Sequence, residues 1–367
     1  LARRAIALDP DAERATELYR AVLDEDAMHA QAGAALQRLY TKAERWDDLV
    51  SLLDRRMSAA TETKVRRDTL LSIAEIREDR LERLEGAAEA FLAVLEIEAD
   101  NLDALKGLER IYARRDQFKE LLGILERQLA LGSTPRQKVA LLERIACLQE
   151  EEFMDVGAAI GTYEKIADID ADHPNALAAL NRLYRSDKRW SQLVEILEHQ
   201  SDLATERAEK LLHLRAEADV LTNNLELWGP ALDVLDKVVE LVPEDKAVLR
   251  EVVVCARKTG KHERAADGLR RMADLTADGV EKGKLLVELG TLQDDELKDH
   301  PAALEAYRAA LDADSTNAAA ASALRDAYLD KGDHTAAIDM LQREIDATSG
   351  GRAKAELLSR MGRIYRR

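Results

Sequence analysis

The chain has 367 residues, of which 46% are hydrophobic, 34% are charged and only 4% are aromatic. The formal net charge of −17 argues against a nucleic-acid backbone as the main partner, because such binding needs a basic surface. No apolar run approaches the roughly 18 residues that a membrane-spanning helix needs. Abundant Ala, Leu, Glu and Arg, with few residues of the kinds that strands prefer, predict an all-helical protein.

An internal repeat of 72 residues organises the chain. The tripeptide Arg110-Ile111-Tyr112 has counterparts 72 residues earlier at 38–40 and 72 residues later at 182–184. The next two steps reach Ala256 and Tyr328. Because each unit of a repeat array packs only on its neighbours, the length of this chain reports the number of repeats and not the number of separate domains.

We expect one continuous array over residues 1–367. Its predicted parts are a partial first unit at 1–62, full units at 63–134, 135–206, 207–278 and 279–350, and a partial last helix at 351–367. Leu1 and Ala2 fall at the repeat positions of Ile73 and Ala74, in the middle of a predicted helix. Neither end carries the polar terminal helix that a solenoid needs, so we interpret the chain as an excerpt of a longer protein.

Each period is predicted to contain four helices, because apolar residues recur at helical spacing. In the second unit their ranges are 64–79, 85–97, 101–114 and 117–131. All six prolines fall at predicted junctions between helices, where the missing amide hydrogen does no harm. Thr134 followed by Pro135 has the pattern of an N-cap with proline at the first helical position. Tyr40, Tyr112 and Tyr184 are predicted to be buried.

The residues that carry chemistry do not converge in the sequence. The seven histidines stand at no metal-ligand spacing, and no phosphate-binding or nucleophile motif occurs. His262 and His334 recur at the position of Trp46, so we interpret them as half-buried rings at helix starts. Cys255 is predicted to be a buried core thiol and Cys147 an exposed one. We therefore predict no catalytic residue, no cofactor and no metal.

A set of residues in the fifth unit has the spacing of a known repeat. These residues, separated by four, four, five and four positions, are Leu324, Tyr328, Gly332, Ala337 and Leu341. They resemble the signature of the tetratricopeptide repeat, a helix-turn-helix of about 34 residues, although Leu stands where the family has Trp. The resemblance implies a right-handed α-solenoid of about ten hairpins, in which hairpins of the family's length alternate with longer ones.

In tetratricopeptide arrays the first helix of each hairpin lines a concave groove that binds partner peptides. The resemblance therefore implies a candidate groove made of basic residues of the 101–114 type of helix, which are Arg38, Lys106, Arg110, Arg114, Arg182, Arg185, Arg250 and Arg257. The 64–79 type of helix would carry acidic residues beside them, which are Glu75, Glu78, Asp79, Glu150, Glu151, Asp219, Asp294 and Asp295. Asp326 replaces the arginine in the fifth unit, so a basic site is expected in the first half of the chain.

This alternation of charge has two interpretations. The one we favour is a ladder of salt bridges between neighbouring helices, because like charges on adjacent helices would otherwise stay unpaired. In the other, the arginines bind the carboxylates of an acidic peptide or of a C-terminus.

The sequence thus predicts a non-catalytic protein–protein interaction scaffold that binds a protein or peptide partner, without nucleic acid. One alternative is a structural spacer or assembly subunit, for which self-association would be expected. Another is the regulatory arm of an enzyme whose catalytic domain lies outside this chain. The residues leave the compartment open, with the cytoplasm preferred to the periplasm, and they do not identify the partner or the oligomeric state.

Overall fold

The computed structural model describes residues 10–366, which form α-helices joined by short turns and contain no strand. The predicted all-α solenoid of helical hairpins is therefore confirmed. The four helices expected in the second unit are α4 to α7, and each begins and ends within one residue of its predicted range. The helix expected around Leu1 and Ala2 lies outside the described residues.

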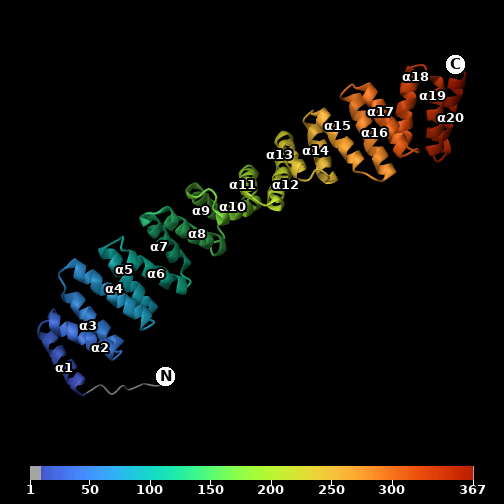
Figure 1. The fold of residues 1–367 in the computed structure, drawn as a ribbon. Helices are drawn as coiled ribbons and strands as arrows, with labels where there is room; N and C mark the ends of the chain where they lie inside the picture. Colours follow the sequence, from blue (N-terminus) through green and yellow to red (C-terminus); the bar gives the residue numbers. More distant parts are fainter. Residues whose placement is uncertain (1–9, 367) are drawn as a thin grey trace. The chain divides into compact units, whose positions relative to one another are not determined.

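The helices, which Figure 1 labels in chain order, fall into two compact units that are described separately. The division lies at residues 179 and 180, inside α10 (Pro174–Ser186). The other described helices of the first unit are α1 (Pro10–Glu25), α2 (Ala30–Lys42), α3 (Trp46–Ala59), α4 (Thr63–Asp79), α5 (Leu84–Ile97), α6 (Leu102–Arg114), α7 (Phe118–Leu131), α8 (Pro135–Glu151) and α9 (Val156–Ile169).

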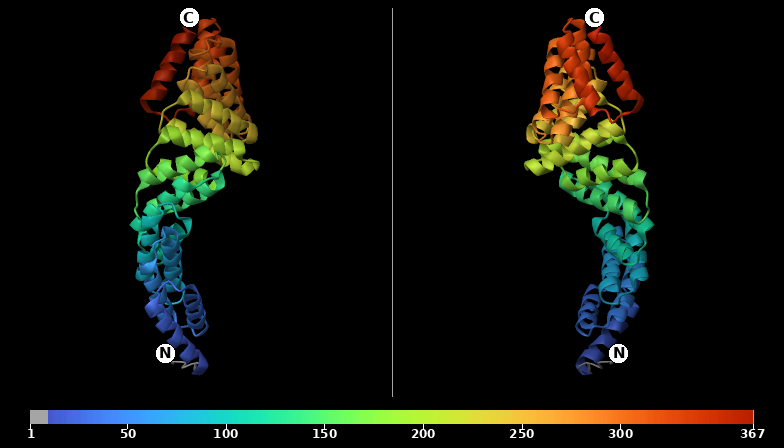
Figure 2. Two further views of the ribbon diagram at one scale, coloured as in Figure 1. Left: turned by 90° about the vertical axis from the view of Figure 1, so that its left-hand side faces the viewer. Right: turned by 90° about the vertical axis from the view of Figure 1, so that its right-hand side faces the viewer.

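The second unit continues the same alternation of hairpins. Its other helices are α11 (Trp190–Leu203), α12 (Arg207–Asn223), α13 (Trp228–Leu241), α14 (Lys246–Lys258), α15 (His262–Asp274), α16 (Gly279–Asp295), α17 (His300–Ala313), α18 (Ala318–Asp330), α19 (His334–Ala347) and α20 (Gly351–Tyr365). Within each unit, most helices that follow one another in the chain lie side by side (Figure 2).

Polar caps and prolines start the helices where the sequence predicts. The Thr134 hydroxyl accepts a hydrogen bond of 3.3 Å from the amide of Gln137, and Pro135 is the first residue of α8. The Asn101 side chain accepts a bond of 3.0 Å from the amide of Ala104 at the start of α6. Each contact satisfies one of the amides that a helix N-terminus leaves without a partner.

The turn inside each shorter hairpin uses one residue in the left-handed backbone region. This repeat position is Glu44, Asp116, Lys188, Gly260 and Gly332, with φ of 51°, 52°, 58°, 71° and 76°. Glycine adopts this region without steric cost, whereas the three residues with side chains do so less readily. Gly332, one of the residues that resemble the family signature, therefore stands where the backbone favours glycine, and Gly260 does so as well.

The apolar core follows the repeat. Tyr40, Tyr112 and Tyr184 are buried as predicted, with exposed fractions of 3%, 8% and 5%. The ring of Phe91 in α5 lies directly against Gly107 in α6, and a Cβ built on this glycine would stand 2.3 Å from Cζ of the ring. Bulky rings and residues without a side chain thus fit together between consecutive helices.

Polar side chains also cross the core of several shorter hairpins. The Gln128 amide donates a hydrogen bond of 2.6 Å to Glu109 between α7 and α6. At the same repeat positions in α18 and α19, Arg325 and Glu344 form an ion pair and are 4% and 5% exposed. These polar side chains therefore have polar partners, as buried polar groups require.

Candidate functional site

The predicted basic groove residues come together on α6 of the first unit. Lys106, Arg110 and Arg114 are spaced four residues apart, so they lie along one side of the helix, and all three are exposed. Lys106 and Arg114 have no ion-pair partner among residues 10–366. This set of three side chains is called the α6 basic stripe below.

Arg110 anchors the α6 basic stripe to the neighbouring hairpin. Its Nε and Nη2 atoms donate hydrogen bonds of 2.9 and 2.7 Å to the two carboxylate oxygens of Glu78 in α4. The Glu78 side chain is 3% exposed, whereas that of Arg110 is 54% exposed. These bonds raise the pKa of Arg110 above its ordinary value. The outer part of the guanidinium remains open to solvent beside Lys106 and Arg114.

The other predicted residues lie apart from this stripe. Arg38 is exposed on α2 and Arg185 on α10, and neither has a salt-bridge partner in the described part of the chain. Arg182 is also exposed on α10. In α14 of the second unit, Arg250 and Arg257 both bind Glu288 of α16, at 2.8 and 3.2 Å.

Of the acidic partners of these arginines, the sequence pattern predicts Glu78 but not Glu288. Glu78 is among the acidic residues that the repeat pattern placed beside the arginines, and it does bind Arg110. Glu288 is not among them, because the corresponding residues in earlier copies include Ser72 and Arg144 and give no periodic signal. The predicted ladder of salt bridges between neighbouring helices is therefore present in part. In the α6 basic stripe Arg110 is paired, whereas Lys106 and Arg114 have no ion-pair partner among residues 10–366.

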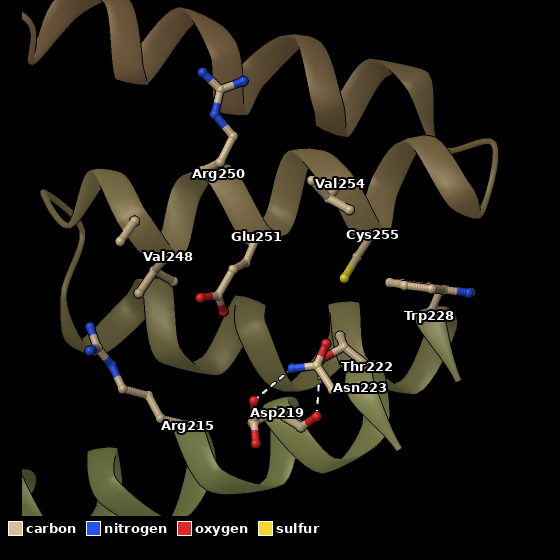
Figure 3. Close-up of a pocket in the computed structure, with 11 residues that line it drawn as sticks. Arg215, Asp219, Thr222, Asn223, Trp228, Val248, Arg250, Glu251, Val254 and Cys255 are labelled. Atoms are coloured by element: carbon tan, nitrogen blue, oxygen red, sulfur yellow. Dashed lines mark hydrogen bonds between the residues drawn. The ribbon is translucent and has the colours of Figure 1, made fainter. Parts of the chain in front are cut away.

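A cavity of about 350 Å³ lies on the second unit between α12 and α14. Figure 3 shows Glu251, Val254 and Cys255 of α14 on one side of this α12–α14 cavity. Asp219, Thr222 and Asn223 of α12 line the other side, and Arg215 and Trp228 stand at its two ends. A cavity here could not be predicted from the sequence, because helical periodicity does not report gaps between side chains.

Two of the charged groups that line this cavity are already engaged. Arg215 binds Asp245 at the start of α14, and Arg250 binds Glu288. The Asp219 carboxylate accepts a bond of 2.7 Å from the Asn223 amide. Burial raises the pKa of Glu251, and the nearby carboxylates of Asp219 and Asp245 raise it further against the opposing effect of Arg215.

The two thiols lie as the sequence predicts, but only one of the two recurring histidines does. Cys255 is 1% exposed and Cys147 is exposed. His262 begins α15 with a partly buried ring, whereas His334 begins α19 with an exposed one, so half-burial holds for the first alone. Within residues 10–366, no three His, Cys, Asp or Glu side chains are grouped so that they could hold a metal ion.

The arrangement is suited to binding charged segments of a polypeptide. Exposed guanidinium and ammonium groups in a row can bind carboxylates, and the cavity offers carboxylates beside apolar walls. No helix in the described part of the chain is long and apolar enough to cross a membrane.

The shorter hairpins of the chain match the model of a known family. The family model described as the tetratricopeptide repeat matches residues 34–66, 104–139 and 176–211. Each match covers most of the first helix of a shorter hairpin, the whole second helix and the start of the helix that follows. No curated protein matches the chain.

Several solved structures are similar to the chain at low identity. One is the Cut9–Hcn1 hetero-tetramer of the APC/C, with 19% identity, coverage of 96% of this chain and 73% of that chain, and a TM-score of 0.29. Another is YrrB, described as a protein of this repeat type with an unusual peptide-binding site, with 16% identity, coverage of 65% and 99%, and a TM-score of 0.30. A third is a tetratricopeptide repeat protein from Parabacteroides merdae, with 15% identity, coverage of 71% and 97%, and a TM-score of 0.31.

Proposed function

We propose that this chain, whose shorter hairpins match the tetratricopeptide repeat model, is a non-catalytic scaffold that binds an acidic segment of a protein partner on the α6 basic stripe. The observation that carries this proposal is the row of three exposed cations at 106, 110 and 114, of which the central one is held in place by Glu78. An ordered guanidinium loses less side-chain entropy when it binds a carboxylate, so a row built around it is a favourable site.

The fixed position of Arg110 also decides which residues should be changed in a test. Replacing Arg110 would leave the buried Glu78 without a partner, so a loss of binding could reflect local unfolding. Lys106 and Arg114 have no such partner, and their replacement should leave the fold intact. These two residues are therefore the informative ones.

The test uses the full chain and a fluorescent peptide with three glutamates four residues apart, together with its glutamine version. Fluorescence anisotropy should show binding of the glutamate peptide and much weaker binding of the glutamine peptide. Lys106→Glu combined with Arg114→Glu should weaken binding by at least about tenfold, which is about 1.4 kcal/mol. Raising the salt concentration should weaken the unmodified complex as well, because exposed charges are screened.

A matched control changes the same charge elsewhere on the first unit. Lys119 in α7 and Lys165 in α9 are exposed lysines on the second helices of their hairpins and have no ion-pair partner among the described residues. Lys119→Glu combined with Lys165→Glu should leave affinity almost unchanged. Equal losses in both double variants would show an effect of net charge alone and would exclude the α6 basic stripe as the site.

A further inference from the structure

The α12–α14 cavity stands where the first unit has an ion pair. Thr222 and Val254 are the residues two periods after Glu78 and Arg110. In the first unit the glutamate and arginine join α4 to α6 through two hydrogen bonds. Threonine and valine cannot form that pair, and both residues line the cavity in the second unit. The cavity thus lies where two short side chains stand in place of a long ion pair.

A third difference places a charge in this cavity. Glu251 is the residue two periods after Gly107, and the other copies of this position hold alanine, at 35, 179 and 323. Gly107 packs against the ring of Phe91, whereas the counterpart of that ring near Glu251 is Leu235, which is smaller. A charged side chain is therefore present at a position that is small in every other copy.

The carboxylate of Glu251 lacks a cation partner. Figure 3 shows it directed away from the α14 backbone toward Asp219 of α12, while Arg250 points to the opposite side of α14. Neither Glu251 nor Asp219 has a salt-bridge partner in the described part of the chain. Both residues are exposed, and Arg215 at one end of the cavity, which is itself paired with Asp245, offsets only part of the repulsion between their carboxylates. A cation placed between the two carboxylates would relieve the rest.

The rest of the cavity suits an aliphatic chain. Val254 is 43% exposed, although it stands within a helix of the stack, and Thr222 and Cys255 line the space beside it. Lys258 lies 5.6 Å from the centre of the Trp228 ring at one end, so that end already holds a cation. The volume of about 350 Å³ is at the low end of the roughly 300–1,000 Å³ range of ligand sites.

We propose that the α12–α14 cavity binds a lysine or arginine side chain of a protein partner. The cationic head would lie between Asp219 and Glu251, and the aliphatic stem would lie along Val254. Such side chains bury an apolar stem while the charge keeps polar contacts. This inference rests on the proposed scaffold function, because it requires a polypeptide partner, but it concerns a separate site of opposite charge.

The second unit carries a related cavity one period later, which supports a segment with more than one basic residue. It has a volume of about 480 Å³ and is lined by Asp294 and Asp326, the counterparts of Thr222 and Val254, and by Asp330. His300 binds Asp294, and Arg325 binds Asp326 at 2.8 Å. Asp330 has no salt-bridge partner within residues 10–366.

The experiment follows the emission of Trp228 in the full chain. Trp46→Phe and Trp190→Phe leave this indole as the one tryptophan of the three in the sequence, and Phe118 already occupies the same repeat position as the two that are changed. The probes are acetylated and amidated five-residue peptides with lysine, norleucine or glutamate between pairs of alanines. Spermidine serves as a cationic probe without a peptide backbone.

The lysine peptide should change the emission in a saturable manner, with an affinity at least about tenfold above that of the norleucine peptide. Glu251→Gln combined with Asp219→Asn should remove this preference. The control is Glu240→Gln combined with Asp274→Asn, which removes two exposed carboxylates without salt-bridge partners on α13 and α15 and should preserve it. Circular dichroism should show the same helix content in both double variants.

Several results would overturn this inference. They are the absence of a saturable change with the lysine peptide, equal binding of the norleucine peptide, preserved preference after the Glu251 and Asp219 changes, or binding of spermidine without binding of the lysine peptide. The glutamate peptide of the α6 test is titrated in parallel. If that peptide binds and the lysine peptide does not, the cavity assignment fails while the scaffold function stands.

Discussion

Arg110 in α6 and Glu78 in α4 form an ion pair with two hydrogen bonds of 2.9 and 2.7 Å across two different hairpins. The Glu78 side chain is 3% exposed and the Arg110 side chain is 54% exposed. The pair therefore compensates a charge that folding removes from water, and it joins one hairpin to the next. Its position on the repeat is also the position at which the second unit carries a cavity.

Removing the arginine alone should be costly. We expect Arg110→Ala to lower the free energy of unfolding of the first unit by about 1–3 kcal/mol, because a buried carboxylate loses its partner. Glu78→Thr combined with Arg110→Val copies the residues at 222 and 254 and should recover most of this loss. Urea unfolding followed by circular dichroism measures both variants. A double variant as unstable as Arg110→Ala would contradict this explanation.

Gly107 should tolerate no larger residue while Phe91 is present. Gly107→Ala places a Cβ about where the ring lies, and we expect a loss of about 1–3 kcal/mol from overpacking. Phe91→Leu, which copies Leu235, should recover part of the loss in the Gly107→Ala background. Gly123 in α7 is the control, because a Cβ there meets nothing within 4 Å. Gly123→Ala should stabilise by up to about 1 kcal/mol through helix propensity.

Glu217 in α12 should make the second unit depend on pH. It is 4% exposed, its Oε2 has no hydrogen-bond partner, and burial raises its pKa to about 7. The carboxylates of Glu198 and Asp202 contribute to this raised value, and Lys237 opposes them. The folded state favours the neutral carboxyl of Glu217. The stability that Glu217 contributes is therefore complete below about pH 4.5 and is lost as the pH rises through about 7.

The corresponding test compares Glu217→Gln with the unmodified chain from pH 5 to pH 8. The variant should gain up to about 3 kcal/mol of relative stability across this interval, since one pKa unit corresponds to about 1.4 kcal/mol. Glu240→Gln, at an exposed position of α13, should show no such trend. A constant difference between Glu217→Gln and the unmodified chain would mean that Glu217 is already ionised in the folded protein.

The left-handed turn residues give a prediction about stability alone. Asp116 adopts a φ of 52° at the repeat position where Gly260 adopts 71°. Asp116→Gly should stabilise the first unit by about 0.5–1 kcal/mol, because relief of backbone strain exceeds the added freedom of the unfolded chain. Gly260→Asp should have the opposite sign in the second unit. Thermal unfolding of the two variants compares them directly, and destabilisation by Asp116→Gly would refute the strain argument.

The helices and their core could be predicted because every copy of the repeat reports the same apolar positions. Tyr112 and Cys255 are buried where the period places them, and Thr134 caps the helix that its sequence predicts. The burial of residues that depart from the repeat pattern could not be predicted in the same way. Glu217 stands where other copies have Ile73, Ile145 and Leu289, and a single sequence does not show whether such a residue is buried or turned to solvent.

The candidate sites could be predicted in part. The pattern placed Lys106, Arg110 and Arg114 on one helix face, and charge alternation pointed to Glu78 as a neighbour. Whether an arginine is held by a carboxylate or remains free depends on side-chain reach across hairpins, which spacing along one helix does not encode. The α12–α14 cavity results from short residues at 222 and 254, so it became visible only with the helices in place.

Amide hydrogen exchange of the full chain, with and without the glutamate peptide, tests the scaffold function most directly, because it shows where the peptide binds. Slower exchange on peptide addition is expected in residues 63–79 and 102–114, which are α4 and α6, with little change in α7 or α9. Protection confined to α7 and α9, or no protection at saturating peptide, would contradict a binding site on the α6 basic stripe.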